Sequence, residues 1–537
     1  MVNIAENQII RSALWAAYGD VVGFPTELLT EQEFLKRNNI ELVQGPIEWT
    51  RRVGGLFGPK ITFAIGTYSD DTQLRLSTSR AIRGDGYFDV ESFAKIELPV
   101  WLNYALGAGR GSKAAAANLA FRESTWSQNF FKSGDIHYCN GGGNGAAMRI
   151  QPHVWQAHAE GPNSFMNAVI KNSICTHGHP RAIIGAAVHA FFLYNALVTK
   201  KSTPPEDWAS IGDTAAISAY ETLTSDPELA LVWVPNWEHL SGKELKTEWS
   251  NTILEWHESV DLARKYCANF KDPVSAYRSI VTALGGLKPS ERGSGLKTAL
   301  FAIVLAWLFR NDQPEVALLV SANTFNSDTD TIATMAGALI GSVSETAPNC
   351  EIQDAEYIRK EARRLYLIGS GKKQSSFKYP DLLTWVPPKN QSDAWIEIDE
   401  KPNLSGLGEI VPFNSSFSSE KGNELMWQWC LLPFGQTVLA KRRRNQINTP
   451  YPRKIGAAIE SSASQAKKTP HIIERALTPN STELNIDVCT QLCIQSGFDA
   501  KIIGETLLSL ATEPNGIERC IAFSAIIAKA KIARSKR

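Results

Sequence analysis

Cysteine is sparse in this sequence, with 8 residues among 537. The cysteines are scattered, and no pair shows the Cys-x-x-Cys or Cys/His spacing of a zinc site. Such usage is typical of reduced thiols, so we expect a cytoplasmic protein without a disulfide framework. Cys489 and Cys493 lie four residues apart in a helical pattern, and we expect them to share a buried face rather than to hold a metal.

The sequence also lacks an excess of charge and a long apolar run. Lysine plus arginine equals aspartate plus glutamate at 55 each, so the net charge does not indicate a nucleic acid or a membrane as a partner. The N-terminus has no basic segment followed by an uninterrupted apolar stretch, and we expect no signal peptide. No run reaches about 18 apolar residues. The closest one, at 298–309, predicts a buried helix.

The composition is otherwise that of an ordinary globular protein, with 43% apolar and 20% charged residues. From residue 6 to about 370, apolar residues recur at helical spacing and alternating strand patterns are rare. The helical patterns lie at 7–23, 70–83, 89–106, 164–198, 213–224, 247–269, 295–309, 314–323 and 328–342. Loops rich in Gly, Asn and Ser lie at 51–60, 107–113, 132–146 and 284–295. We therefore predict an all-α domain over residues 1–370.

Near residue 371 the character of the sequence changes, because prolines, serines and lysines accumulate. We expect a mixed region with short strands at 371–450, a flexible linker at 451–480 and a small region of three amphipathic helices at 481–537. The basic segments Lys441–Arg444 and Lys529–Arg537 could contact nucleic acid or an acidic protein weakly, although solvated charge is the commoner explanation.

Two short acidic clusters carry the clearest chemical signal. Ser69–Thr72 and Asp328–Thr331 each open a helical pattern, and each combines two carboxylates with hydroxyl groups. Hard divalent cations such as Mg²⁺ prefer oxygen ligands, so the pair could form a two-metal site if the fold brings them together. The alternative is helix capping, because Asp, Ser and Thr are favoured N-caps and acids suit the first turn. Residue chemistry alone leaves both interpretations open.

Three further segments contain groups that could serve a site. Gly19–Glu27 predicts a loop after the first helix, where Glu27 could act as an acid or base; the alternative is a helix end with an exposed glutamate. Cys139–Arg149 is a glycine-rich loop that runs into a helix, which suits an anion although it is no Walker motif. His177, within Thr176–Pro180, could contact a ligand base or be structural.

Taken together and in this order, the segments resemble the ADP-ribosylglycohydrolase family over about residues 6–368. The matching blocks are GDVVGFPTE, SDDT, GNGAAMRIQP and SDTDTIATMAGALIGS, with THGHPRAIIGAAVHA as a fifth. Each block is modest, but five blocks in the family's order are specific. The resemblance implies an all-α domain with a binuclear Mg²⁺ (or Mn²⁺) centre at the bottom of a cleft, where the metals engage ribose hydroxyls.

Carried over position by position, the resemblance assigns roles to residues of this chain. The implied metal ligands are Ser69, Asp70, Asp71, Asp328, Asp330 and Thr331. The implied catalytic residues are Glu27, Asp70, Asp71 and Asp328. The implied substrate-binding residues are Gly143, Asn144 and Gly145 around the ribose and diphosphate, and His177 near the adenosine end.

The sequence departs from the family pattern at three places. Ser69 stands where Thr is commoner, and Asn326–Ser327 stand where many members have two glycines. Some members carry an acid just before the Gly-Asn-Gly loop, whereas the nearest acid here is Asp135. The resemblance therefore leaves the general acid open, and Glu27 is the first candidate.

The function implied is metal-dependent removal of ADP-ribose from an ADP-ribosylated acceptor, by cleavage of the glycosidic bond at C1″. A protein side chain is the first acceptor class to consider, while modified nucleic-acid ends and small ADP-ribose derivatives stay open. The alternatives are an inactive module that binds ADP-ribose or a related nucleotide, and a different metal hydrolase on the same fold.

Overall fold

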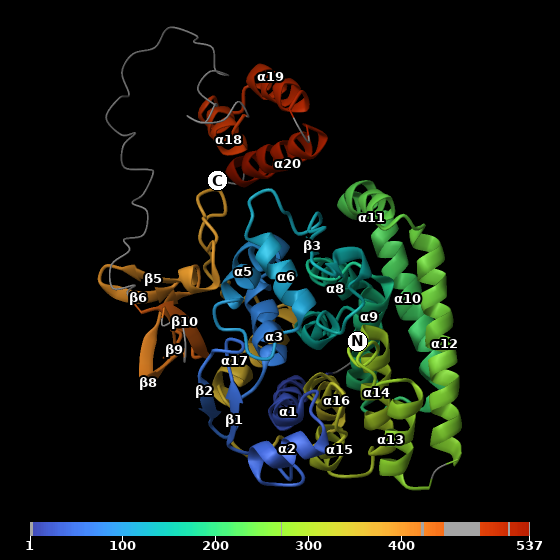
Figure 1. Cartoon of the computed structure of the whole chain (residues 1–537). Helices are drawn as coiled ribbons and strands as arrows, with labels where there is room; N and C mark the ends of the chain where they lie inside the picture. Colours follow the sequence, from blue (N-terminus) through green and yellow to red (C-terminus); the bar gives the residue numbers. More distant parts are fainter. Residues whose placement is uncertain (1–3, 270, 420–423, 445–483, 514–515, 536–537) are drawn as a thin grey trace. The chain divides into compact units, whose positions relative to one another are not determined.

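Figure 1 shows the computed structural model of the chain, which describes residues 4–269, 271–419, 424–444, 484–513 and 516–535. The chain forms two compact units, and each is described by itself. The first unit comprises Met1–Pro380 and Val386–Thr449, and the second comprises Asp381–Trp385 and Pro450–Arg537. The linker predicted at 451–480 lies outside the described residues.

The first unit is mostly helical, as the apolar periodicity predicts. Its helices are α1 (Glu6–Gly23), α2 (Glu31–Asn38), α3 (Asp70–Ala81), α4 (Val90–Ser92), α5 (Leu98–Trp101), α6 (Arg110–Leu119), α7 (Gln151–Gln156), α8 (Pro162–Ile174), α9 (Pro180–Thr199), α10 (Trp208–Ser225), α11 (Val234–Ser241), α12 (Leu245–Asn269), α13 (Pro273–Ala283), α14 (Gly295–Leu308), α15 (Pro314–Ala322), α16 (Thr329–Val343) and α17 (Ala355–Gly369). The helical pattern predicted at 164–198 forms two helices, α8 and α9, which are separated by residues 175–179. Pro180 begins α9, since its missing N–H is tolerated in the first helical turn.

The described strands of this unit form small antiparallel sheets. Two are hairpins, β1–β2 (Trp49–Arg52 and Lys60–Phe63) and β3–β4 (Lys132–Ser133 and Ile136–His137). Two have three strands each, β5–β6–β7 (Trp395–Ile398, Lys401–Leu404 and Gly408–Glu409) and β8–β9–β10 (Val411–Ser418, Leu425–Leu431 and Thr437–Arg443). Short strands therefore do follow the helical region, whereas both hairpins interrupt segments whose glycines and serines predicted loops.

Helices α1 and α16 form the central pair, with backbones close enough to require glycine. A Cβ atom added to Gly19 would lie 2.2 Å from the carbonyl oxygen of Ala333, and one added to Gly337 would lie 2.2 Å from that of Trp15. One turn further along α1, a Cβ on Gly23 would lie 2.5 Å from Cα of Asp330. This approach brings the end of α1 against the start of α16.

We expect Gly19→Ala to lower the free energy of unfolding by about 1–3 kcal/mol, because the added methyl group would meet backbone atoms that cannot rotate away. Gly111→Ala is the matched control, since Gly111 also lies in a helix and a Cβ atom there would meet nothing within 4 Å. Urea unfolding followed by circular dichroism measures both. Equal stability of the two variants would contradict the close packing of α1 on α16.

Helix α9 is long and apolar enough to cross a membrane, but 78% of its apolar window is buried inside the protein. This burial is what a core helix of a globular unit shows. The shorter apolar helix α14, which covers all but the last residue of the run at 298–309, is mostly buried, as predicted.

The second unit contains α18 (Ile486–Gln495), α19 (Ala500–Ala511) and α20 (Gly516–Ser535), which confirms the three predicted helices. Its small core consists of Leu484, Cys489, Cys493, Leu510, Phe523 and Ile527. Cys489 and Cys493 do share a buried face, as their spacing predicts, and both are free thiols.

Candidate active site

Glu27 lies just beyond α1, from which it is separated by the short 3-10 turn η1 (Phe24–Thr26). The expected loop from Gly19 was wrong, because α1 continues through Gly23 and is held there by α16. Thr329 Oγ1 donates to the carbonyl oxygen of Gly23 at 2.8 Å. The Glu27 side chain is only 11% exposed, and Arg51 Nη1 donates to its Oε2 at 2.9 Å. The alternative of a helix end with an exposed glutamate therefore does not describe this structure.

The first acidic cluster, Ser69–Thr72, begins α3 in a tightly held turn. Ser69 is the N-cap, and its Oγ accepts from the backbone N–H of Asp71 at 3.2 Å. The backbone N–H of Asp70 donates to the carbonyl oxygen of Leu106 at 2.7 Å. Because Ser69 caps the helix, the carboxylates of Asp70 and Asp71 are not needed as caps.

Asp20, on α1, holds this turn from behind. Its carboxylate accepts three hydrogen bonds, from Ser69 N at 2.8 Å, Thr72 N at 2.9 Å and Thr72 Oγ1 at 2.6 Å. The side chain is completely buried. No role was predicted for Asp20 from the sequence. One feature of the sequence could have indicated a role for Asp20, because it is a carboxylate within a stretch of apolar and small residues. Burying a carboxylate is costly unless it is hydrogen-bonded.

The second acidic cluster, Asp328–Thr331, begins α16. Asp328 occupies the N-cap position but its side chain caps no N–H group; instead it accepts from Asn144 Nδ2 at 2.8 Å. Thr331 Oγ1 lies 3.4 Å from Asp71 Oδ1, and this contact joins the two clusters across 260 residues of sequence. Capping therefore does not explain the carboxylates of Asp71 and Asp328.

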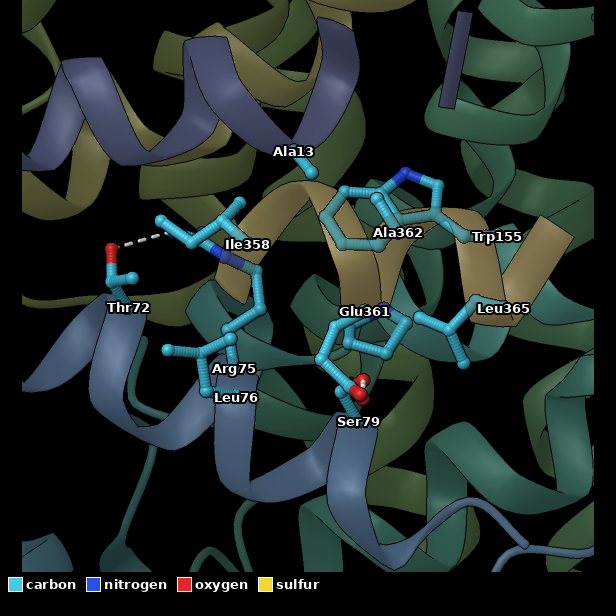
Figure 2. Close-up of a pocket in the computed structure, with 11 residues that line it drawn as sticks. Ala13, Thr72, Arg75, Leu76, Ser79, Trp155, Ile358, Glu361, Ala362 and Leu365 are labelled. Atoms are coloured by element: carbon cyan, nitrogen blue, oxygen red, sulfur yellow. Dashed lines mark hydrogen bonds between the residues drawn. The ribbon is translucent and has the colours of Figure 1, made fainter. Parts of the chain in front are cut away.

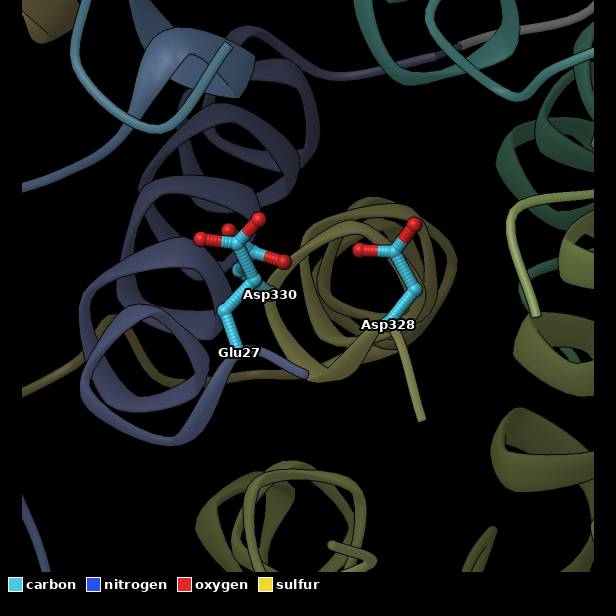
Figure 3. Close-up of side chains that lie close together, drawn as sticks. All are labelled: Glu27, Asp328 and Asp330. Atoms are coloured by element: carbon cyan, nitrogen blue, oxygen red, sulfur yellow. The ribbon is translucent and has the colours of Figure 1, made fainter. Parts of the chain in front are cut away.

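The carboxylates converge where the segment after α1 meets the start of α16. Glu27, Asp328 and Asp330 each offer an oxygen atom, and these atoms all lie within 4.8 Å of one another (Figure 3). Asp70 and Asp71 lie near this group, since both repel Asp328 electrostatically and Asp71 Oδ1 is 3.4 Å from Thr331 Oγ1 at the start of α16. From here on, the acidic cluster means Glu27 together with the carboxylates of the two short clusters, Asp70, Asp71, Asp328 and Asp330.

The electrostatics of the acidic cluster fit a divalent cation. Burial, followed by repulsion from neighbouring carboxylates, raises the pKa values of Asp70, Asp71 and Asp330 well above their usual range. Asp71 Oδ2 is buried and accepts no hydrogen bond from the described residues. Buried carboxylates that repel one another are unfavourable unless a cation compensates them, and oxygen-only donors match Mg²⁺ or Mn²⁺.

The glycine-rich loop lies beside the acidic cluster and is tied to it through Asn144, whose Nδ2 contacts Asp328. The backbone N–H groups of Gly143 and Gly145 donate no hydrogen bond within the described part of the chain. His177 packs beneath this loop, because a Cβ atom on Gly145 would lie 2.9 Å from its Cε1. Burial lowers the pKa of His177 to about 3, so its ring is neutral. The loop thus contains two backbone N–H groups that make no hydrogen bond within the described residues, and the histidine beneath it is uncharged.

Arg149 and Asp135 precede or follow the glycines of this loop, and they differ in burial and in their partners. Arg149 is buried under the loop, where its Nη1 donates to the carbonyl oxygen of Gly145 at 2.9 Å and its Nη2 to Thr176 Oγ1 at 2.8 Å. Asp135, the nearest acid before the loop, instead pairs with Arg110 on the surface, where both side chains are 75% exposed. Asp135 therefore does not stand in for the acid that some family members carry.

A small pocket lies beside α3 (Figure 2), and its lining includes no member of the acidic cluster. Apolar side chains of α1, α7 and α17 line it together with Arg75, Ser79 and Glu361. Ser79 Oγ donates to Glu361 Oε2 at 2.6 Å, and Arg75 Nη2 donates to Thr72 Oγ1 at 2.7 Å. With room for about one water molecule, the pocket cannot admit a nucleotide. Its polar groups instead hydrogen-bond within α3 and join α3 to α17.

A family model described as ADP-ribosylglycohydrolase matches residues 3–347. The uncharacterized protein YegU of Escherichia coli (strain K12) is 25% identical over 349 residues, which cover 63% of this chain and 88% of that protein. Among solved structures, an ADP-ribosylglycohydrolase-related protein complex is similar with 17% identity and a TM-score of 0.42, over 68% of this chain and 98% of that chain.

Proposed function

The chain belongs to the ADP-ribosylglycohydrolase family, and on that premise we propose that it is a metal-dependent hydrolase that releases ADP-ribose from an ADP-ribosylated acceptor by cleaving the glycosidic bond at C1″. The observation that carries the proposal is the convergence of the acidic cluster with the glycine-rich loop. Asn144 donates to Asp328 at 2.8 Å, so the loop suited to a diphosphate and the carboxylates suited to cations share one site. A protein side chain is the acceptor class to test first.

The metal ligands that we propose are Ser69, Asp70, Asp71, Asp328, Asp330 and Thr331. Two Mg²⁺ ions, or Mn²⁺ in their place, supply charge neutralisation and Lewis-acid polarisation when bound. The unpartnered Oδ2 of Asp71 supports this assignment, since a buried carboxylate oxygen requires a partner. Asp20 orients the Ser69–Thr72 turn and stays outside the ligand set, because its oxygens already accept three hydrogen bonds.

The remaining residues have roles in binding and proton transfer. We propose that the backbone N–H groups of Gly143 and Gly145 bind the diphosphate, and that His177 fixes the loop near the adenosine end. Glu27 is the proposed acid or base at the scissile bond, a role worth roughly 10²- to 10⁴-fold in rate. Cleavage at C1″ passes through a transition state with oxocarbenium character, as in other glycoside hydrolysis.

Metal binding to the acidic cluster can be tested without a substrate. We expect Mg²⁺ to raise the melting temperature, since a ligand at 100 times its Kd stabilises the folded state by about 2.7 kcal/mol. We expect Asp71→Asn to lose this response and to melt above the wild type in EDTA, because the change removes one buried, mutually repelling charge. A wild-type melting temperature that is the same in Mg²⁺ and in EDTA would contradict the proposed site. Asp135→Asn, on the exposed surface, is the control.

A further inference from the structure

The β8–β10 sheet lies outside residues 3–347, which match the family, yet it packs against the residues next to the acidic cluster. One buried core joins the two parts of the first unit. Its members are Phe24, Trp49, Ile61, Phe63, Leu106, Trp427, Trp429 and Leu439. Phe24 lies three residues before Glu27, and Leu106 accepts the hydrogen bond from the Asp70 N–H group. The sheet is therefore connected to two members of the cluster, to Glu27 through the β1–β2 hairpin and to Asp70 through the segment 103–106.

The first connection runs through the β1–β2 hairpin. The Trp427 ring lies directly on Gly54 in the hairpin turn, because a Cβ atom there would be 2.2 Å from Trp427 Cζ2. Phe63 packs edge-on against Trp429, with ring centroids 6.3 Å apart. Ser419 Oγ also donates to the carbonyl oxygen of Phe57 at 2.9 Å. The sheet thus fixes both the turn and a strand of the hairpin.

The same hairpin carries Arg51, which pairs with Glu27. The Arg51 guanidinium lies over the Phe24 ring at 5.2 Å from its centroid, and its Nη1 contacts Glu27 Oε2 at 2.9 Å. Phe24 in turn packs edge-on against Trp49 of β1 at 4.9 Å. Because Glu27 is surrounded by carboxylates that repel it, a cation held at a fixed place decides where its carboxylate rests.

The second connection runs through β10 to Asp70. Lys441 and Asn103 exchange two hydrogen bonds, Asn103 Nδ2 to Lys441 O at 2.7 Å and Lys441 N to Asn103 Oδ1 at 3.1 Å. Three residues later, Leu106 O accepts from Asp70 N at 2.7 Å. Gly107 follows with a φ of +82°, and a Cβ atom there would lie 3.1 Å from Asp70 Oδ1. The strand therefore anchors the loop that holds Asp70.

We propose that the β8–β10 sheet is a structural part of the active site, and that Arg51 is the positioning residue through which it holds the Glu27 carboxylate. The proposal rests on the proposed function for what Glu27 does, but the position of Glu27 can be tested apart from it. Under this proposal the site is competent for catalysis only when the β8–β10 sheet, which lies outside residues 3–347, is folded.

Hydrogen–deuterium exchange of the full-length protein tests the structural half. We expect Trp427→Leu to accelerate exchange in peptides that cover 24–29 and 49–63, and Arg51→Gln to accelerate it in 24–29. Trp249→Leu is the matched control, because it removes a buried tryptophan of α12 and should leave 24–29 unchanged. Should Trp427→Leu fail to fold, Arg51→Gln decides alone, since Arg51 is 31% exposed and its replacement leaves the core intact. Unchanged exchange at 24–29 would overturn the proposal.

Turnover of an ADP-ribosylated substrate tests the catalytic half. We expect Arg51→Gln to lower kcat about 10-fold while KM stays within about 2-fold, because a misplaced group costs rate more than binding. Arg51→Lys should restore part of the rate, and Arg83→Gln, which breaks an exposed 2.9 Å ion pair elsewhere, should have no effect. The Trp427→Leu/Arg51→Gln double variant should be no slower than the slower single variant. Additive losses would show that Trp427 does not act through the hairpin and Arg51. Absence of wild-type turnover together with the expected exchange would count only against the proposed function.

Discussion

Replacing Asp70 and Asp328 together by alanine is expected to reduce ADP-ribose release by more than about 1,000-fold, since removing even one group from an electrostatic site commonly costs 10²- to 10³-fold. The two residues begin different helices, α3 and α16, and both interact electrostatically within the acidic cluster. Their joint loss removes a carboxylate from each half of the site. Chromatographic detection of free ADP-ribose measures the effect.

The double variant should remain folded, because Asp70→Ala removes a buried charge that repels its neighbours and Asp328 is only half-buried, so neither change removes an apolar contact. A far-UV circular dichroism spectrum like that of the wild type checks this point. Asp135→Ala is the control with full activity expected, since Asp135 pairs with Arg110 far out on the surface. Residual release within about 10-fold of the wild type would contradict a role for these carboxylates in the chemistry.

Glu27→Gln is expected to lower kcat by roughly 10²- to 10⁴-fold, the range that a positioned acid or base contributes. Glutamine keeps the size of the side chain and can still meet Arg51, but it cannot transfer a proton. Calorimetric binding of ADP-ribose in Mg²⁺ should stay within about 3-fold of the wild type, since a group that acts mainly in the transition state contributes little to ground-state binding. Glu31→Gln, at an exposed position of α2, should have no effect.

The same variant separates two roles for Glu27. One of its oxygen atoms lies within 4.8 Å of those of Asp328 and Asp330, so Glu27 could also contact a cation. Loss of the Mg²⁺-dependent rise in melting temperature in Glu27→Gln would assign it to the metal site. Retained metal response with lost turnover is the result that the acid or base role requires. Retained turnover would move that role to another residue.

The helices and the chemical groups of the site could be predicted from the sequence, because both depend on local patterns. Apolar spacing predicted α1, α3 and α16, and the paired carboxylates of Ser69–Thr72 and Asp328–Thr331 indicated a metal site as one of two interpretations, beside helix capping. The close approach of α1 and α16 has a local signature as well, in glycines placed one turn apart on the same helical face, such as Gly19 and Gly23.

The supporting contacts could not be predicted, because their partners are far apart in the sequence. Nothing near Asp20 shows that it will accept hydrogen bonds from Ser69 and Thr72, and nothing near Arg51 points to Glu27. The glycines of 51–60 predicted a loop, whereas Gly54 is needed so that the Trp427 ring can lie on a hairpin turn. Long-range packing overrides local propensity at such places.

The measurement that tests the central claim most directly is ADP-ribose release by the full-length protein from a panel of substrates. The panel contains arginine-linked and serine-linked ADP-ribosylated proteins, ADP-ribosylated nucleic-acid ends and a small ADP-ribose derivative, each with Mg²⁺, with Mn²⁺ and with EDTA. The account predicts release from at least one substrate that requires the metal and is abolished in Asp70→Ala/Asp328→Ala. Binding of ADP-ribose without release from any substrate would contradict it and would identify the chain as a nucleotide-binding module.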